Sequence, residues 1–309
     1  MRWEEVEVGD PGKGELRLRH TAAGLNYIDT YHRTGLYKLP MPLTLGMEGA
    51  GVVEAVGRGV TGLKPGDRVA YATMPLGSYS EARLIPAERV VKIPAGISDE
   101  QAASMMLKGM TACYLLRETH RVAKGETVLV HAAAGGVGLI LCQWAKHLGA
   151  TVIGTVGTDA KARLARAHGC DHAIVYTKQS FVERVKAITK GAGVPVAYDS
   201  VGKATYPGSL DCLAPRGLWV SFGNASGPAP PVSPIELGQR GSLYMTRPSL
   251  PHYTATRKAL DRIAGELFRV VTSGAVKIEI NQRYALKDAA KAHRDLEARK
   301  TTGSTVLLP

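Results

Sequence analysis

The chain has 309 residues, of which 45% are hydrophobic and 21% are charged, and its formal net charge at pH 7 is +12. This composition excludes a wholly disordered chain, and glycine without a three-residue period excludes collagen. Basic residues are scattered rather than clustered, so we do not expect a nucleic acid partner. No run of about 18 apolar residues occurs, so we predict no membrane span, and the start lacks a signal-peptide pattern, which predicts a cytoplasmic protein.

The first part of the chain reads as short strands interrupted by glycine and proline. Apolar runs at 49–56, 68–71 and 89–93 are each followed by such turn residues. Short strands with frequent turns are typical of a small, curved β-barrel.

The middle of the chain alternates strands and helices. Alternation of this kind predicts an α/β domain with a doubly wound parallel sheet, covered by helices on both faces. The expected strands are 127–131, 151–156, 172–175, 194–198, 217–222 and 242–245, and the expected helices are 137–148, 160–168 and 181–189. Two helices, 254–272 and 286–299, and a strand, 304–308, follow and return to the first domain.

The four cysteines, at positions 113, 142, 170 and 212, form no closely spaced pair. Their spacing excludes a zinc ribbon, and their apolar neighbours predict buried free thiols in a reducing compartment.

The strand at 127–131 leads into a turn of small residues and then into a helix. Ala133, Gly135 and Gly138 occupy the three positions of a G-x-G-x-x-G pattern, with alanine at the first. A dinucleotide pyrophosphate needs this arrangement, because small residues admit the phosphates and the helix N-terminus offers N–H groups to them. A tight strand–helix turn without a ligand is the alternative.

The end of the second strand selects between the two nicotinamide dinucleotides. Its tip, Val156-Gly157-Thr158, carries no acid that would bind the ribose hydroxyl of NADH. Asp159 is expected in the first turn of the next helix, as a partner of the helix dipole. Lys161 lies one turn further on, where it suits a 2′-phosphate, so NADPH is favoured; a solvated surface lysine is the alternative.

Six segments together resemble the zinc-free, zeta-crystallin-like NADPH:quinone oxidoreductases of the medium-chain dehydrogenase/reductase superfamily. The resemblance covers almost the whole chain and implies a Rossmann domain inserted into a GroES-like β-barrel catalytic domain. The implied limits are 1–108 and 250–309 for the catalytic domain and 109–249 for the NADPH-binding domain, with the family's first strand missing. The matching segments are 22–29, 46–51, 65–69, 131–138, 198–202 and 221–224, with 244–249 closest to the bacterial type.

The resemblance also implies that no metal is bound. Zinc-dependent members of the superfamily carry cysteine where this chain has Asn26 and histidine where it has Met47. Glu48 remains, and we expect it to be a buried glutamate paired within the barrel, because one carboxylate does not make a tetrahedral zinc site.

The resemblance implies transfer of hydride from NADPH to a quinone, with roles for individual residues. Asn26 and Tyr31 would line the nicotinamide end, and Tyr31, Tyr37 and Arg247, supported by Asn26 as a donor, would stabilise the developing oxyanion. Packing at the barrel lip is the alternative for Tyr37, and a salt bridge is the alternative for Arg247. The remaining cofactor residues are Gly135, Gly136 and Val137 on the pyrophosphate, Gly157, Thr158 and Lys161 on the adenosine phosphate, Tyr176 on the adenine or its ribose, and Ser200, Phe222, Gly223 and Asn224 beside the nicotinamide.

Three further polar residues have a less specific expected role. Lys108 and Thr111 either touch the cofactor or pack a helix, and His131 is read as a hydrogen-bonded structural histidine rather than a base.

Two other functions remain open from the sequence. An enone or alkenal reductase would use the same scaffold, and a nucleotide-sensing or RNA-binding protein could keep the same fold. We also predict a homodimer, because the strand at 242–245 would be an exposed edge of the parallel sheet that can pair with its copy.

Overall fold

The computed structural model describes all residues from Met1 to Pro309. It divides into two compact units, each described by itself below. Unit 1 is Met1–Met110, Tyr253–Thr272 and Ile278–Pro309, and unit 2 is Thr111–His252 and Ser273–Lys277.

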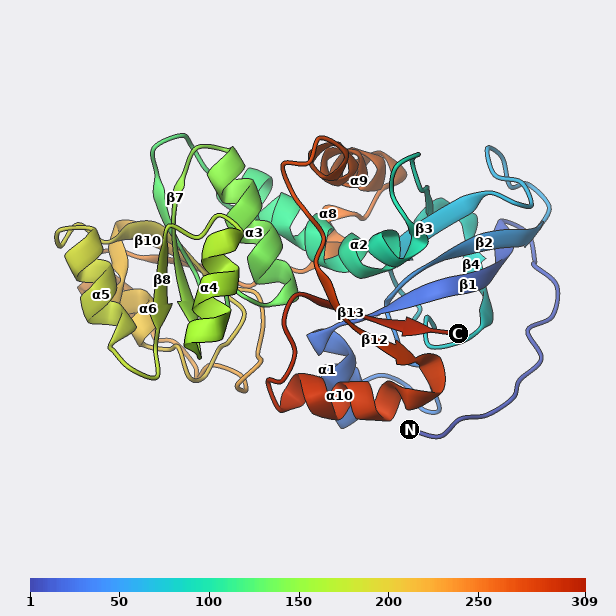
Figure 1. Ribbon diagram of the computed structural model, residues 1–309, viewed down its shortest axis with the longest axis horizontal. Coiled ribbons are helices and arrows are strands. Elements are labelled where there is room, and N and C mark those ends of the chain that lie inside the picture. Colours follow the sequence, from blue (N-terminus) through green and yellow to red (C-terminus); the bar gives the residue numbers. More distant parts are fainter. The chain divides into compact units, whose positions relative to one another are not determined.

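Unit 1 is built on a seven-stranded sheet in the order β12-β13-β1-β2-β3-β5, with β4 paired to β1 (Figure 1). Along β1, Leu16 and Leu18 are fully buried while Arg17 and Arg19 pair with Glu54 on the other face. This alternation is the period of a half-buried strand. The strands are β1 (Glu15–Leu25), β2 (Glu48–Val56), β3 (Arg68–Ala72), β4 (Ala82–Pro86), β5 (Val91–Lys92), β12 (Ile280–Ala285) and β13 (Ser304–Leu308).

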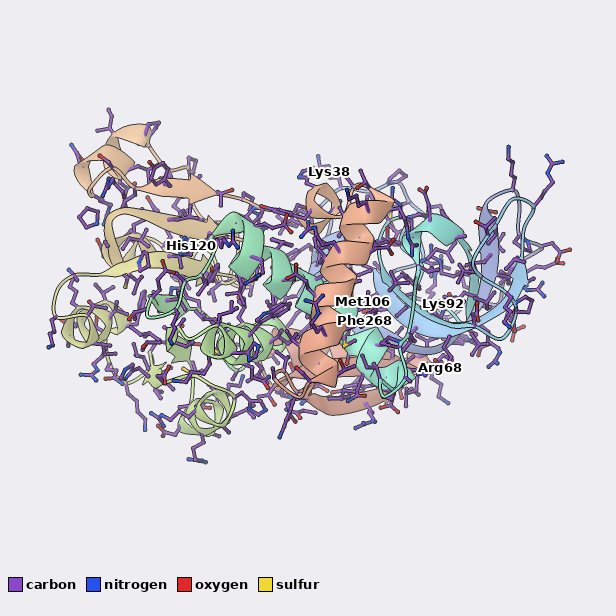
Figure 2. The ribbon with its side chains drawn as sticks, turned by 90° about the horizontal axis from the view of Figure 1, so that it is seen from above. Lys38, Arg68, Lys92, Met106, His120 and Phe268 are labelled. Atoms are coloured by element: carbon purple, nitrogen blue, oxygen red, sulfur yellow. The ribbon has the colours of Figure 1, made fainter.

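Helices close this sheet. Figure 1 shows α10 from the end of the chain beside α1 from its beginning, and Figure 2 shows α9, labelled at Phe268, lying across α2 at Met106. The two helices approach closely at Gly109 of α2, since a Cβ atom there would lie only 2.4 Å from the side chain of Leu267 of α9. The helical elements are α1 (Tyr27–Thr34), η1 (Ala87–Arg89), α2 (Asp99–Tyr114, shared with unit 2), α9 (Arg257–Thr272), η3 (Leu286–Asp288) and α10 (Ala289–Glu297).

Unit 2 is a six-stranded parallel sheet in the order β11-β10-β9-β6-β7-β8. The chain starts in the middle at β6, runs outward through β7 and β8, and then runs the other way through β9, β10 and β11, which is the doubly wound Rossmann order. The strands are β6 (Thr127–Val130), β7 (Thr151–Val156), β8 (His172–Val175), β9 (Val194–Asp199), β10 (Leu213–Ser221) and β11 (Tyr244–Thr246). The helices are η2 (Leu115–Thr119), α3 (Gly136–His147), α4 (Asp159–Ala167), α5 (Phe181–Ile188), α6 (Gly208–Asp211), α7 (Pro234–Gln239) and α8 (Leu250–Tyr253).

The expected α/β class is confirmed, and three expected strands need correction. The run 89–93 contains only the short β5, because Ala87–Arg89 forms a helical turn. β10 begins at Leu213, before the expected 217, and its pairing with β9 shifts register before Leu218. The edge strand expected at 242–245 is Tyr244–Thr246, because Ser242 has a positive φ of 59° and turns the chain instead of extending it.

All four cysteines are free and buried, as expected. Every helix falls short of the combined length and apolar character that crossing a membrane requires.

Candidate functional site

The turn between β6 and α3 in unit 2 has room only for small side chains. A Cβ atom on Gly138 would lie 2.2 Å from the carbonyl oxygen of Ala132, and one on Gly154 of β7 would lie 2.6 Å from the Cβ of Ala133. Ala133 is fully buried, and its N–H donates to the carbonyl of Thr155 at 3.1 Å. The chain therefore bends sharply against β7.

The N-terminus of α3 is open to an anion. Its N-cap, Gly135, offers no side chain to the helix, and the first turn holds no acidic residue. By contrast, α4 and α5 are capped by the side chains of Thr158 and Ser180. The Gly135 N–H donates to the Ala132 carbonyl at 2.9 Å, but the N–H groups of the first turn of α3 and the positive end of its dipole suit a phosphate, so the segment of Gly135, Gly136 and Val137 fits a dinucleotide pyrophosphate.

The groups assigned to the adenosine phosphate lie together at the ends of β7 and β8. The Tyr176 hydroxyl stands 2.9 Å from where a Cβ atom of Gly157 would be, and Tyr176 is 43% exposed. The Lys161 N–H donates to Thr158 Oγ1 at 3.3 Å, so Thr158 begins the helix that carries Lys161. Asp159 forms an ion pair with Lys178 at 2.5 Å. The hydrogen bond from Lys178 is the main reason why the pKa of the exposed Asp159 carboxyl is lowered.

The loops after β9 and β10 also meet. The Phe222 N–H donates to the carbonyl of Asp199 at 2.8 Å, and a Cβ atom on Gly223 would lie 2.5 Å from the carbonyl oxygen of Ser200. Arg247 donates to the carbonyl of Ser221 at 2.6 Å. In doubly wound sheets, ligands bind at the carboxyl ends of strands such as these.

Asp199, at the end of β9, is a buried hydrogen-bond centre that the sequence analysis did not identify. Its Oδ1 accepts the N–H groups of Val201 and Gly202 at 2.8 and 3.1 Å, and its Oδ2 accepts Ser209 Oγ at 2.8 Å and Trp219 Nε1 at 3.1 Å. Burial opposes ionisation of Asp199, but the charge that His131 carries when protonated and the hydrogen bonds from the Gly202 N–H, the Thr205 hydroxyl and the Val201 N–H outweigh burial and lower its pKa below the ordinary 3.8.

This centre also fixes the role of His131. The single hydroxyl hydrogen of Ser209 is donated to Asp199, so His131 Nε2, 3.1 Å away, donates to the Ser209 oxygen. His131 Nδ1 lies 2.9 Å from Thr155 Oγ1, and burial lowers the pKa of His131. His131 is thus a neutral, fully bonded structural histidine, and the cluster is not arranged as a nucleophile and base.

Unit 1 holds Asn26 and Tyr31, which were expected at the nicotinamide end, and Tyr37, which was expected to stabilise the oxyanion. Asn26 is the N-cap of α1, and Tyr31 lies within this helix. The rings of Tyr31 and Tyr37 meet edge to face with centroids 5.2 Å apart, and the Tyr37 N–H donates to the Tyr31 carbonyl at 3.2 Å. The phenol of Tyr37, in the turn after α1, therefore packs against that of Tyr31, which is 7% exposed.

Glu48 lies behind Asn26 and is completely buried. It accepts hydrogen bonds from Asn26 Nδ2 at 2.7 Å, the Leu107 N–H at 2.8 Å and Lys108 Nζ at 3.0 Å. Glu48 is buried and paired as expected, but its ion-pair partner Lys108 belongs to helix α2 and not to a strand of the barrel. For Asn26 the structure differs from the expected donor, because its amide hydrogens face Glu48 and, at 3.4 Å, the Gly24 carbonyl.

A second series of hydrogen-bonded side chains holds α1 in place. Asp29 Oδ2 accepts the Asn26 N–H at 2.8 Å and the Tyr79 hydroxyl at 3.0 Å, and Tyr79 lies 3.0 Å from His293 Nε2 of α10. Arg33 lies 3.2 Å from His293 Nδ1. Burial raises the pKa of Asp29 to about 7 and, with Arg33, lowers that of His293 to about 4. The sequence did not predict this hydrogen-bonded series, because its members come from distant segments.

Sites with three or more potential metal-ligating His, Cys, Asp or Glu side chains do not occur in the structure. At the position where zinc-dependent relatives carry histidine, Met47 is 3% exposed.

Unit 1 holds Asn26, Tyr31 and Tyr37, and unit 2 holds Arg247 and the other residues assigned to the dinucleotide.

The fold and these two groups of residues define a medium-chain dehydrogenase/reductase. The alcohol dehydrogenase GroES-like domain matches residues 12–95, and the domain described as zinc-binding dehydrogenase matches residues 136–264. The chain is 56% identical to a quinone oxidoreductase of Pseudomonas aeruginosa over 310 aligned positions, covering 100% of this chain and 95% of that relative. Within the class, the chain belongs to the quinone oxidoreductase family.

Two further relatives bear on the function. A 2-haloacrylate reductase of a Burkholderia species is 51% identical, covering 99% of this chain and 94% of that protein. The crystal structure of Escherichia coli quinone oxidoreductase complexed with NADPH is 51% identical, with a TM-score of 0.97, covering 99% of this chain and 95% of that chain.

Proposed function

We propose that this protein is an NADPH-dependent quinone oxidoreductase. The observation that carries the proposal is the uncapped, acid-free N-terminus of α3 behind a turn that only small residues fit. The similarity over the whole chain to quinone oxidoreductases, one of them solved with NADPH, supports the same activity and cofactor. We propose residues 1–108 and 250–309 as the catalytic domain and 109–249 as the NADPH-binding domain, and the two compact units support this division.

The cofactor, when bound, supplies the hydride, and the protein supplies orientation and charge. We propose that Gly135, Gly136 and Val137 bind the pyrophosphate, with the other assigned residues as follows: Gly157, Thr158, Lys161 and Tyr176 on the adenosine phosphate side, and Ser200, Phe222, Gly223 and Asn224 on the nicotinamide side. Tyr31, Tyr37 and Arg247 are proposed to donate hydrogen bonds to the quinone oxygen that becomes negative. Phenols and a guanidinium suit this task because each donates toward an anion.

The test is a panel of quinones and enones assayed with NADPH and with NADH. We expect quinone reduction with NADPH at rates well above those with enones. The 51% identity to 2-haloacrylate reductase makes a reductase of activated carbon–carbon double bonds the second candidate. Faster turnover of enones or haloacrylates than of any quinone would establish that candidate. Failure of every substrate, together with salt-dependent RNA binding, would favour a nucleic acid role instead.

We propose that the reaction needs no zinc. Asn26, bonded to Glu48, and the buried Met47 stand where relatives carry zinc ligands. The panel is therefore run on chelator-treated protein, and unchanged turnover is expected. Four buried free thiols support a reducing compartment, so we propose the cytoplasm as its location.

We propose a homodimer joined through β11. This strand is at the end of its sheet, pairs only with β10, and exposes Tyr244 by 61% and Met245 by 47%. An exposed apolar edge of this kind pairs readily with its own copy across a two-fold axis. Light scattering is expected to give twice the chain mass.

A charged substitution on this edge provides the control for the dimer. Tyr244→Lys should lower the measured mass, whereas Val6→Lys, at a position 74% exposed in unit 1, should not. A wild-type protein that scatters as one chain at every concentration would contradict the dimer.

Lys161→Ala is expected to weaken NADPH binding by about 1–3 kcal/mol, the range of a hydrogen bond to a charged group. NADH affinity should stay nearly unchanged, because NADH lacks the 2′-phosphate. Cofactor titration by fluorescence measures both. The matched control is Lys186→Ala in α5, at an exposed position, which should change neither affinity. An equal loss for the two cofactors would exclude Lys161 from the phosphate site.

A further inference from the structure

Two of the four buried thiols lie side by side in unit 2. Cys142 is on α3, and Cys170 lies in the turn between α4 and β8. This turn packs directly on α3, since a Cβ atom on Gly169 would lie 3.0 Å from the Cys142 carbonyl oxygen. The Cys142 thiol donates a hydrogen bond to Cys170 Sγ, and the Cys170 thiol is directed at the Val152 carbonyl at 3.8 Å. The fold therefore brings together two sulfur atoms from segments that β7 and α4 separate in the sequence.

The surroundings make Cys170 the more nucleophilic sulfur of the pair. The hydrogen bond between the thiols is the main reason why the pKa of Cys170 is lowered and that of Cys142 is raised, and the Gly154 N–H also stabilises the Cys170 thiolate. The negative charge of Asp171 opposes this thiolate, but Lys146 pairs with Asp171 at 2.5 Å. The thiolate is the reactive form of cysteine, so Cys170 is the sulfur that attacks.

Both sulfurs are enclosed, but one of them lies next to an edge of the sheet. Cys142 is 0% exposed and Cys170 is 3% exposed. Cys170 comes just before β8, which is the outermost strand of its sheet. A small oxidant can reach it through local opening of this edge, whereas a large one is kept out.

We propose that Cys142 and Cys170 are a dithiol that a peroxide oxidises to a disulfide within unit 2. Hydrogen-bonded thiols need only a short approach to reach the S–S bond length of about 2 Å. The bond would join α3 to the turn before β8. In a reducing compartment such a bond is transient and serves to sense oxidant, and this inference does not depend on the proposed activity.

The reaction takes two steps. The Cys170 thiolate attacks one oxygen of hydrogen peroxide, so that an S–O bond forms, the O–O bond breaks, and hydroxide leaves as water with the proton that Cys170 has lost. The Cys142 sulfur then attacks the sulfenic sulfur of Cys170, so that the S–S bond forms, the S–O bond breaks, and the second water takes the Cys142 proton. Two thiols lose two electrons and two protons, and the peroxide becomes two waters. A dithiol reductant reverses the change by thiol–disulfide exchange.

The test treats the folded, full-length protein with hydrogen peroxide, blocks the remaining thiols with iodoacetamide and maps the tryptic peptides. Trypsin separates the two cysteines into the peptides 125–146 and 167–178. We expect these peptides to be joined, two of the four free thiols to be lost, and dithiothreitol to restore both. Protein that is unfolded in guanidinium during the oxidation is the control, and its cysteines should pair without this preference.

Two variants separate the roles of the thiols. Cys142→Ala should give no cross-link and should leave Cys170 as a sulfenic acid, which dimedone traps. Cys212→Ala is the matched control, because burial is the main reason why the pKa of Cys212 is raised to about 12, and it should keep the cross-link. The peptide map of the wild-type protein decides the question even if a variant does not fold.

Three results would overturn the inference. One is a folded wild-type protein that keeps all four thiols free in peroxide while the unfolded protein loses them. Another is oxidation of Cys170 to sulfinic acid without any cross-link. The third is a disulfide that joins other cysteines or two chains.

Discussion

Gly138→Ala is expected to weaken NADPH binding by about 100-fold, or nearly 3 kcal/mol. The added methyl group would lie 2.2 Å from the Ala132 carbonyl oxygen and 2.9 Å from the Ala133 backbone. Both contacts are with backbone atoms that cannot rotate away, so the turn must move relative to the first N–H groups of α3. A phosphate held by those N–H groups depends on their placement. Titration of NADPH fluorescence measures the loss.

The matched control for this variant is Gly265→Ala in α9. A Cβ atom at Gly265 meets nothing within 4 Å, and the residue lies in the interior of a helix. The same substitution there should leave NADPH affinity unchanged and raise the free energy of unfolding by up to about 1 kcal/mol, the difference in helix propensity. If Gly138→Ala binds NADPH as the wild-type protein does, the turn is not the phosphate site.

Asp199→Asn is expected to lower the free energy of unfolding by about 4 kcal/mol, because several hydrogen bonds of about 1.5–3 kcal/mol each to one buried carboxylate are weakened together. The amide oxygen can still accept the Val201 and Gly202 N–H groups, but the amide nitrogen then faces Trp219 Nε1, which only donates. The unfolding temperature of Asp199→Asn should be lower than that of the wild-type protein by on the order of 10 °C.

The pH dependence of stability provides an independent readout of Asp199. Because the pKa of Asp199 is lowered from 3.8 in the folded protein, its contribution is present above pH 3.8 and is lost as the pH falls through the lowered value. The variant should lack this loss in acid. Asp211→Asn, which breaks a partly exposed ion pair with Arg240, is the control and should cost less than about 1 kcal/mol. Equal effects of the two substitutions would contradict a special role for Asp199.

Local patterns in the sequence predicted the sheet of unit 2 well. The strands Thr151–Val156 and His172–Val175 have the expected limits, because apolar runs of this length between turn residues mark buried parallel strands. The tight turn between β6 and α3 was predicted for the same reason, since all its determinants lie within 14 consecutive residues, 127–140. The strands β1 and β12 were not predicted, because the residues that alternate with their core-facing ones are mostly polar. The five-residue strand β4 was not predicted either, since one of its two buried positions holds Arg83.

The hydrogen bonds that orient the site could not be predicted in this way. Asn26 is 22 residues from Glu48, and Lys108 is 60 residues beyond it. A lone lysine in an apolar helix gives no sign of its partner, and an asparagine gives no sign of which amide atom it presents. Such properties depend on pairing in space, which composition and spacing do not contain.

The pairing of β1 with β13 has a consequence for biosynthesis. Ala23 is opposite Leu307, so the sheet of unit 1 is complete only after β13, which lies far beyond β1 in the sequence, has been synthesised. Unit 2 is drawn almost entirely from one continuous segment, Thr111–His252, so its sheet can form while the rest of the chain is still being made. Unit 2 is then expected to fold first, and unit 1 to remain accessible to chaperones until β13 has been synthesised.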